Sequence, residues 1–192
     1  MTPTPPTLLL DTCAIINLSY CSPIATLFKT RYTGRAGWTR AVQTELTRQR
    51  SRKPPHPQAG RASNWATSWL PSPIEIVDPV DQSAIATIQT QIAVGSEDDN
   101  LDHLGEASSI HLLAMAGVGR LISDDHGARA VSRHQYQVRA SSTVGVLSEL
   151  LARGEVVPET VDLYLDTLRA NKRMHVALSS RELLRRDLGP WE

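Results

Sequence analysis

The sequence predicts an α/β fold in which a central parallel sheet is flanked by helices and followed by a C-terminal helical extension. Short apolar runs alternate with helical segments along most of the 192 residues, and this alternation is typical of parallel strands joined by crossover helices. The runs lack the polar alternation of a half-exposed strand, as expected when both faces are covered. We place the α/β domain at residues 7–156 and the helical extension at residues 157–192.

In the first half of the chain, a strand over 8–10 ends directly on Asp11, and Ala14, Ile15 and Leu18 then recur at helical spacing. Trp65 and Trp69 stand four residues apart on a later helix, which most simply indicates a core contact. The other elements predicted in this half are a helix over 39–49, a basic proline-broken loop over 50–57, a helix over 62–70, a strand over 74–77 and a helix over 80–92.

In the second half, an acidic polar loop over 95–103 leads to a helix that Gly105 opens and Gly117 closes. A strand over 120–123 then ends on the pair Asp124 and Asp125. The remaining predicted elements are a helix over 126–134, a strand over 137–140, a helix over 142–152 and tail helices over 158–169 and 179–188.

Composition narrows the class of protein. The hydrophobic fraction is 41% and the charged fraction 21%, as in ordinary globular domains. The 20 basic residues balance the 20 acidic ones, which argues against a uniformly basic coat but allows a local patch. Two cysteines, Cys13 and Cys21, exclude a disulfide framework and a four-cysteine zinc site. Without a membrane-length apolar run or a basic signal segment, we expect a cytoplasmic protein with no membrane partner.

Acidic residues gather at one edge of the predicted sheet. Asp11 and the pair Asp124/Asp125 each follow a strand, and Glu106 lies in the first turn of a helix that begins at the same edge. Glu45 joins them only if its helix packs nearby. Singly, each acid has a structural explanation, as a helix N-cap, a helix-dipole partner or a surface ion pair.

Jointly, several carboxylates at one edge would repel each other, and burial would protonate some of them. A divalent cation removes this conflict, and an all-oxygen ligand set suits Mg²⁺ or Mn²⁺ better than zinc. The acids therefore predict a cation site.

Four segments carry a family resemblance. LLLDTCAIINL (8–18), TRAVQTELTRQ (39–49), LGEASSIHLLA (104–114) and LISDDHGAR (121–129) resemble the acidic blocks of the PIN domain, in the family's order. The resemblance covers roughly residues 7–156 and is greatest to a subgroup with a GEAEAI block. It implies a PIN-like three-layer fold and a metal-dependent ribonuclease that acts on RNA. It further implies the toxin of a type II, VapBC-type toxin–antitoxin pair with a cognate antitoxin protein, and a homodimer, since members commonly dimerise.

Position by position, the resemblance implies Asp11, Glu45 and Glu106 as metal-binding carboxylates. The family's Thr-x-Asp pattern selects Asp125 as the fourth, whereas a shift of one residue selects Asp124, and both stay candidates. The chain departs from the family in three residues, none of them one of these acids. They are Cys13 where serine is common, Ser108 for the second glutamate of GEAEAI, and Ser123 for threonine.

The supporting residues follow from the chemistry. The hydroxyls of Thr12 and Ser123 are candidates to orient ligands or waters. Metal-assisted hydrolysis requires no histidine base, so we assign His103 and His126 structural or loop roles. The candidate RNA-binding cations, which an ordinary solvated basic loop explains equally well, are Arg48, Arg50, Arg52, Lys53, Arg129 and Arg133.

Two other functions compete with the nuclease. One is a non-catalytic PIN-like module for protein–protein interaction, favoured by the helical tail and the small basic patch. The other is a phosphoryl-transfer protein of receiver or phosphatase type, suggested by the acid after a strand, although the aspartate pair comes last here rather than first. A phosphate-binding loop of the G-x-x-x-x-G-K-[ST] type and a G-x-S-x-G elbow are both missing from the sequence.

Overall fold

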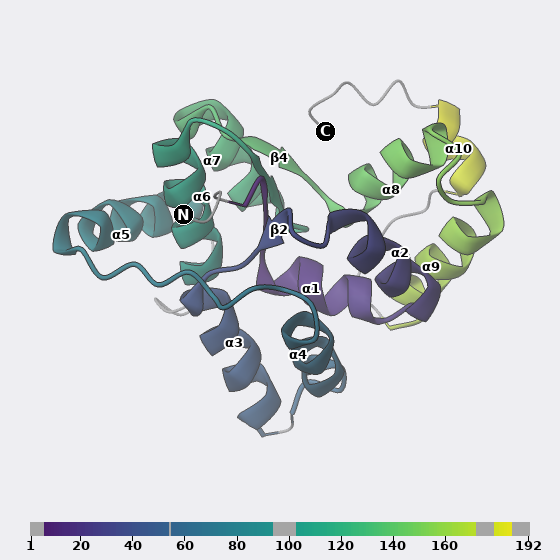
Figure 1. Cartoon of the computed structure of the whole chain (residues 1–192), viewed down its shortest axis with the longest axis horizontal. Coiled ribbons are helices and arrows are strands. Elements are labelled where there is room, and N and C mark those ends of the chain that lie inside the picture. The colour runs from purple at the N-terminus through teal and green to yellow at the C-terminus, as the bar shows by residue number, and fades with distance from the viewer. Residues whose placement is uncertain (1–5, 54, 94–102, 172–178, 186–192) are drawn as a thin grey trace.

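A parallel sheet forms the centre of the molecule. The computed structural model describes residues 6–53, 55–93, 103–171 and 179–185. Its four-stranded sheet has the order β2-β1-β3-β4 (Figure 1), and all neighbouring strands run parallel. The strands are β1 (Leu8–Leu10), β2 (Ala36–Gly37), β3 (Arg120–Ile122) and β4 (Arg139–Ser141). The predicted α/β class, a parallel sheet flanked by helices, is confirmed.

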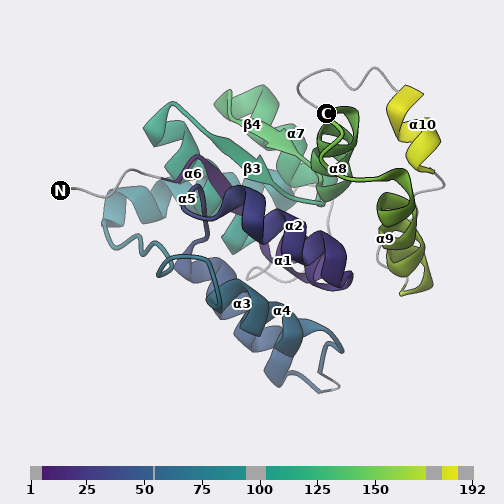
Figure 2. The same ribbon diagram turned by 45° about the vertical axis from the view of Figure 1, so that its right-hand side comes forward.

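Helices cover both faces of the sheet because its side chains alternate between two cores. Leu8 and Leu10 lie in one core, and Leu9 lies in the other. The first core also takes residues of α1 (Thr12–Ser19), α2 (Ser22–Tyr32), α3 (Arg40–Ser51), α4 (Ala59–Thr67), α8 (Thr143–Ala152), α9 (Pro158–Ala170) and α10 (Ser180–Arg185). The second takes residues of α5 (Pro79–Ala93), α6 (Leu104–Ala116) and α7 (His126–Tyr136). The result is a three-layer arrangement (Figure 2).

The prediction of a strand over 74–77 is wrong. Only Ile74 pairs, in a parallel bridge with Thr39, where its N–H donates to the Trp38 carbonyl at 2.9 Å. The chain then leaves the sheet, and Val77 is 73% exposed. Burial on both faces, which stabilises a parallel strand, is therefore not available to this run. The edge strand beside β1 is instead β2, which the sequence analysis did not predict, and α2 was also not predicted.

The other predicted elements form, with small shifts at their ends. β4 begins at Arg139 because Gln137, at φ 57°, ends α7 in a left-handed conformation. Trp65 and Trp69 make the expected contact, with ring centroids 5.3 Å apart. Of the loop predicted over 95–103, only His103 is among the described residues, and the end of the last helix beyond 185 also lies outside them.

The C-terminal helices pack on the domain. Tyr164 and Leu168 of α9 are fully buried in the same core as Leu8 and Leu10. The division at residue 157 stays a prediction, while the tail contributes directly to the first core. None of the described helices is long and apolar enough to cross a membrane.

Candidate active site

The acidic residues lie at the carboxyl ends of β1 and β3. These strands are neighbours, and β1 lies between β2 and β3, so the chain connections leave it in opposite directions along the sheet. Such a switch point opens a crevice beyond the strand ends. Asp11 follows β1 and Asp124 follows the short continuation of β3, so the topology alone brings two distant segments together.

Asp11 is held by the helix that it caps. Its backbone is extended, and its Oδ1 accepts the Ala14 N–H at 2.5 Å, which satisfies one free donor at the start of α1. The side chain is fully buried. Its second oxygen, Oδ2, is also buried and has no hydrogen-bond partner among the described residues.

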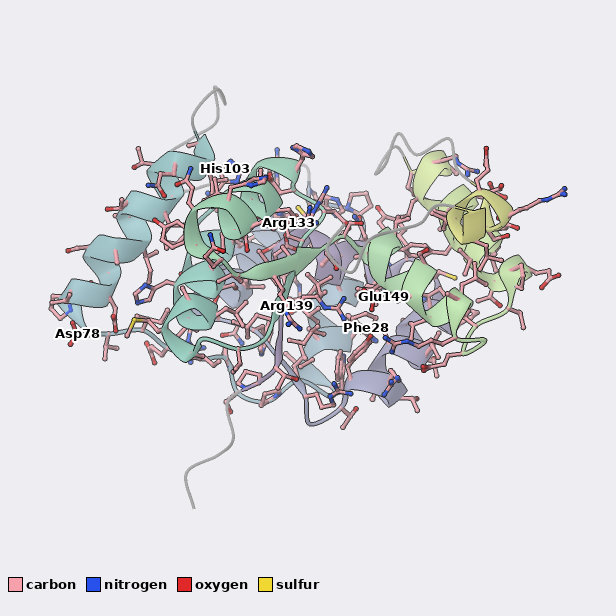
Figure 3. All side chains as sticks on the ribbon, turned by 90° about the horizontal axis from the view of Figure 1, so that it is seen from above. Phe28, Asp78, His103, Arg133, Arg139 and Glu149 are labelled. Atoms are coloured by element: carbon pink, nitrogen blue, oxygen red, sulfur yellow. The ribbon has the colours of Figure 1, made fainter. Side chains whose placement is uncertain are left out.

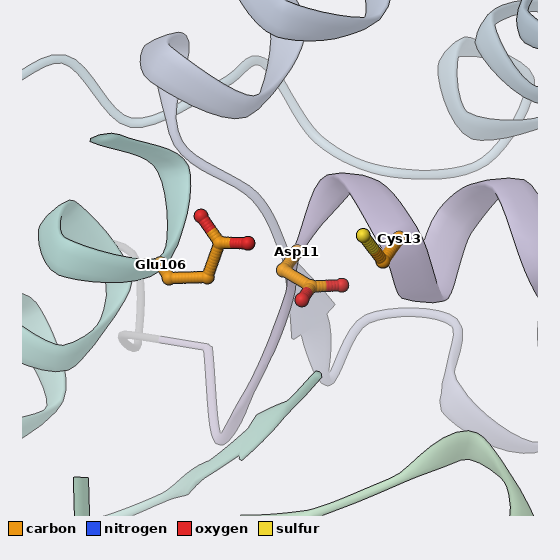
Figure 4. Close-up of side chains that lie close together, drawn as sticks. All are labelled: Asp11, Cys13 and Glu106. Atoms are coloured by element: carbon orange, nitrogen blue, oxygen red, sulfur yellow. The ribbon is translucent and has the colours of Figure 1, made fainter. Parts of the chain in front are cut away.

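Glu106 faces Asp11 from the first turn of α6. It is only 5% exposed, and its Oε2 is a second buried oxygen without a hydrogen-bond partner in the described part of the chain. One oxygen of each carboxylate and the Cys13 Sγ all lie within 4.8 Å of one another (Figure 4). A buried polar atom without a partner costs about 1–3 kcal/mol, so this pair of carboxylates fits a cation-binding site better than an inert core.

Glu45 joins the site through two hydrogen bonds. Its Oε1 accepts the Gly105 N–H at 3.0 Å, and its Oε2 accepts the Thr12 hydroxyl. A Cβ at Gly105 would lie 2.8 Å from Val42 Cγ2 and 3.1 Å from Glu45 Oε2. Glycine is therefore what lets α6 approach α3 closely enough to complete this contact.

Asp124 has a full set of donors. Its Oδ2 accepts the Asn17 side-chain amide at 2.7 Å, and its Oδ1 accepts the Thr143 N–H at 2.9 Å. The Thr143 hydroxyl donates to the same carboxylate, at 2.9 Å from Oδ2, and lies 3.1 Å from the Tyr164 hydroxyl of α9. Asp124 is thus fixed by α1 and α8, and α9 supports it through the contact of Tyr164 with Thr143.

Asp125 occupies a different position beside it. Its Oδ1 caps α7 by accepting the Ala128 N–H at 2.7 Å. Its Oδ2 lies 3.7 Å from Nδ1 of His103, the residue that precedes α6 with a left-handed φ of 69°. The electrostatic influence of Asp124 is felt at Asp11 and that of Asp125 at Glu106. Each aspartate is therefore close enough to one of the two buried acids to raise its pKa.

Burial and mutual repulsion raise the pKa values of the acids in this cluster. Burial is the main reason why the pKa of Asp11 lies well above its usual value, and the nearby Asp124 and Glu45 carboxylates raise it further. The Ser123 hydroxyl and the Ala14 amide lower this pKa but do not cancel the rise. The pKa of Glu106 is raised in the same way, mainly by burial and further by the negative charges of Asp11, Glu45 and Asp125.

Burial also raises the pKa of Asp124, against the lowering effects of Asn17, Thr143 and Arg129. In the two residues with unsatisfied oxygens, the charged form is therefore disfavoured unless an outside positive charge compensates it.

The other residues predicted from the sequence divide into two groups. Thr12 contacts Glu45, and Ser123 accepts the Asp125 N–H at 3.1 Å, so both hydroxyls touch the acids they were predicted to support. His126, the first residue of α7, is exposed. His103, which is labelled in Figure 3, lies close to Asp125, with 3.7 Å between its Nδ1 and the Asp125 Oδ2.

The candidate cations are spread over two surfaces. Arg48 lines a cavity of about 460 Å³ that also contains Glu45 and lies between α3, α5 and the start of α6. Arg129 donates to the Ser123 carbonyl at 2.8 Å, and Arg133 to the Ala140 carbonyl at 2.9 Å, so both are held at strand ends. The exposed cations near the end of α3 are Arg50, Arg52 and Lys53.

Sequence reasoning missed the residues that hold Asp124 and the position of the thiol. Asn17 had a detectable signal in the sequence, because it is an amide among the apolar residues Ala14, Ile15, Ile16 and Leu18. Thr143 follows the strand next to β3, so it stands at the same sheet edge. Cys13 was noted only as a departure from the family pattern, and no spacing rule placed its sulfur beside Glu106.

Comparison with known proteins agrees with this geometry. A family model described as a PIN domain matches residues 7–189, which is nearly the whole chain. No curated protein and no solved structure gives a significant match.

Proposed function

We propose, from the premise that the chain belongs to the PIN-domain family, that its acidic pocket is the active site of a metal-dependent ribonuclease. The observation that carries the proposal is the pair of buried, unpartnered oxygens, Asp11 Oδ2 and Glu106 Oε2. They belong to segments nearly a hundred residues apart, yet one oxygen of each carboxylate lies within 4.8 Å of the other. Buried like charges without partners are unfavourable unless the pocket binds a cation.

The proposed ligands for this cation are Asp11, Glu45, Glu106 and Asp125, with Asp124 beside them. Their carboxylate oxygens suit Mg²⁺ or Mn²⁺. When bound, such an ion stabilises charge on the phosphate oxygens and lowers the pKa of a water. Asp124 accepts hydrogen bonds from three donors, the Asn17 amide and both the N–H and the hydroxyl of Thr143, so we assign it the role of fixing the strand end.

The chain's own groups fix the geometry of the pocket. The Thr12 hydroxyl and the Gly105 N–H hold the Glu45 carboxylate at its two oxygens. The Ser123 hydroxyl favours the ionised form of Asp11, which is the form that a cation requires. These contacts orient the acids before any substrate binds, which reduces the reorganisation that the reaction needs.

For the substrate, we propose RNA that approaches across the cavity beside Glu45. Arg40 and Arg48 line that cavity, and Arg50, Arg52 and Lys53 continue the positive charge along the exposed end of α3. Contacts with phosphates would position the strand without reading its sequence and would weaken as salt rises. Arg129 and Arg133, which already bind backbone carbonyls, flank the other side.

The biological role that we propose is that of a VapBC-type toxin. This part of the proposal rests on the resemblance of the GEA and DDxxAR segments, Gly105–Ala107 and Asp124–Arg129, to that subgroup. It predicts a cognate antitoxin protein, action in the cytoplasm where RNA is the substrate, and a homodimer.

The test is the variant Asp11→Asn, which keeps the oxygen that caps α1 but removes the charge. We expect RNA cleavage stimulated by Mg²⁺ or Mn²⁺ to fall by about 100-fold or more, because a metal contributes several kcal/mol to the transition state. Asp166→Asn is the matched control, since Asp166 is an acid whose side chain is 70% exposed on α9. It should cleave RNA like the wild type.

Cleavage that survives Asp11→Asn undiminished, in a folded and nuclease-free preparation, would contradict the proposal. A metal titration separates the nuclease from a non-catalytic binding module. Mn²⁺ at 100 times its dissociation constant should stabilise the wild type by about 2.7 kcal/mol, whereas the module would show neither cleavage nor this stabilisation.

A further inference from the structure

The thiol of Cys13 lies beside the carboxylates of Asp11 and Glu106. Cys13 is the second residue of α1, and the same turn starts from Asp11. Its Sγ, an oxygen of Asp11 and an oxygen of Glu106 lie within 4.8 Å of one another (Figure 4). The ligand atoms of a tetrahedral zinc site lie roughly 3.5 Å apart, given Zn–S near 2.3 Å and Zn–O near 2.1 Å.

A second observation, independent of the thiol, also points to a ligand here. Both carboxylates are more than nine-tenths buried, and each keeps one buried oxygen that accepts no hydrogen bond from the described residues. A cation between them would satisfy both oxygens and remove their mutual repulsion.

We propose that Asp11, Cys13 and Glu106 form a mixed carboxylate–thiolate site for a thiophilic divalent cation of the Zn²⁺ class. Mg²⁺ binds oxygen and makes little use of sulfur, whereas Zn²⁺ and Co²⁺ accept thiolate and carboxylate together. On binding, the thiol releases its proton to solvent and the sulfur becomes a ligand. Three protein ligands leave a fourth position open, as in sites that exchange water.

The consequence is competition between two kinds of metal. The inference rests on the proposed function because the two sites share Asp11 and Glu106. A Zn²⁺-class ion in this site would exclude Mg²⁺ from those carboxylates. A pocket lined only by oxygens would not discriminate through sulfur, so Cys13 makes this chain sensitive to thiophilic metals.

Cobalt is the probe that reports sulfur ligation directly. Titrating the metal-free protein with Co²⁺ should produce the near-ultraviolet absorption of sulfur-to-cobalt charge transfer, and Zn²⁺ should abolish that absorption by displacing the Co²⁺. Cys13→Ser keeps a side chain of similar size and should lose the band. Cys21→Ala is the matched control, since Cys21 is a buried thiol at the start of α2, and this variant should keep the band.

No charge-transfer band in the folded wild type, or an equal band in Cys13→Ser, would overturn the inference. The second measurement is inhibition of Mg²⁺-dependent RNA cleavage by Zn²⁺, each variant compared with its own rate without Zn²⁺. We expect Cys13→Ser to need at least tenfold more Zn²⁺ than the wild type for half inhibition, and equal sensitivity would count against a thiolate ligand.

The two proposals fail in different ways. A Cys13-dependent cobalt band in a protein that never cleaves RNA would support this site and overturn the ribonuclease. Mg²⁺-dependent cleavage with no such band would overturn this site and leave the ribonuclease standing.

Discussion

Acids at two parts of the same sheet edge differ in the hydrogen-bond donors that surround them. Asp11 and Glu106 each keep a buried oxygen without a partner among the described residues. Asp124, which follows the neighbouring strand, accepts hydrogen bonds from Asn17 and from both the backbone and side chain of Thr143. Proximity of carboxylates is therefore not by itself the mark of an ion site. The informative difference is whether the protein supplies donors or leaves the oxygens unsatisfied.

The largest effect that we expect is on the pH dependence of stability without metal. Because the pKa values of Asp11 and Glu106 are raised on folding, the folded protein binds protons that the unfolded chain has released. This proton binding adds to the free energy of unfolding. The added stability is fully present below the pKa values of the unfolded chain and is lost as the pH rises through the pKa values of the folded protein. Wild-type stability should therefore fall with rising pH relative to that of the double variant Asp11→Asn, Glu106→Gln.

Urea unfolding in the presence of a chelator, at pH steps from acid to neutral, measures this difference. If the free energy of unfolding changed with pH in the same way for both proteins, the oxygens of Asp11 and Glu106 would be as well satisfied as those of Asp124. The two parts of the sheet edge would then not differ. Saturating Mn²⁺ should reverse the trend, because the ion binds the deprotonated carboxylates.

Asp124→Asn should destabilise the protein by about 1–3 kcal/mol, with or without metal. The new amide would place a donor against those of Asn17 and Thr143, which leaves buried polar groups unsatisfied. Thermal or urea unfolding measures the loss. The comparison with Asp11→Asn is direct, since the same chemical change at Asp11 relieves repulsion in the metal-free protein. A neutral result at Asp124 would mean that its donors contribute little.

The smallest effects concern two helical glycines that differ in their surroundings. Gly105→Ala should cost about 1–2 kcal/mol and reduce cleavage, because a Cβ there would lie 2.8 Å from Val42 Cγ2 and would displace Glu45. Gly60→Ala in α4 meets nothing within 4 Å and should stabilise by about 0.5–1 kcal/mol through helix propensity. Equal effects on unfolding free energy would show that Gly105 has no special role in the approach of α6.

Much of this site could be predicted from strand order, and the rest depends on packing. Asp11 and the Asp124/Asp125 pair follow strands, so the α/β topology by itself predicts that they lie at one edge of the sheet. Glu45 required knowledge of how α3 packs, which the structure supplies through Gly105 and Thr12. The same limit explains the errors in the fold. Two residues, Ala36 and Gly37, make a strand too short for any periodicity, and the run after Ile74 looks like a strand but leaves the sheet.

The two hydrogen bonds of Glu45 join residues 33 and 60 positions apart in the chain. The proposed ribonuclease activity therefore requires segments from both halves of the chain. A nascent chain that ends before α6 lacks both Glu106 and the amide that fixes Glu45, so it carries no complete centre. The proposed activity is therefore possible only once synthesis has passed α6, beyond the middle of the sequence.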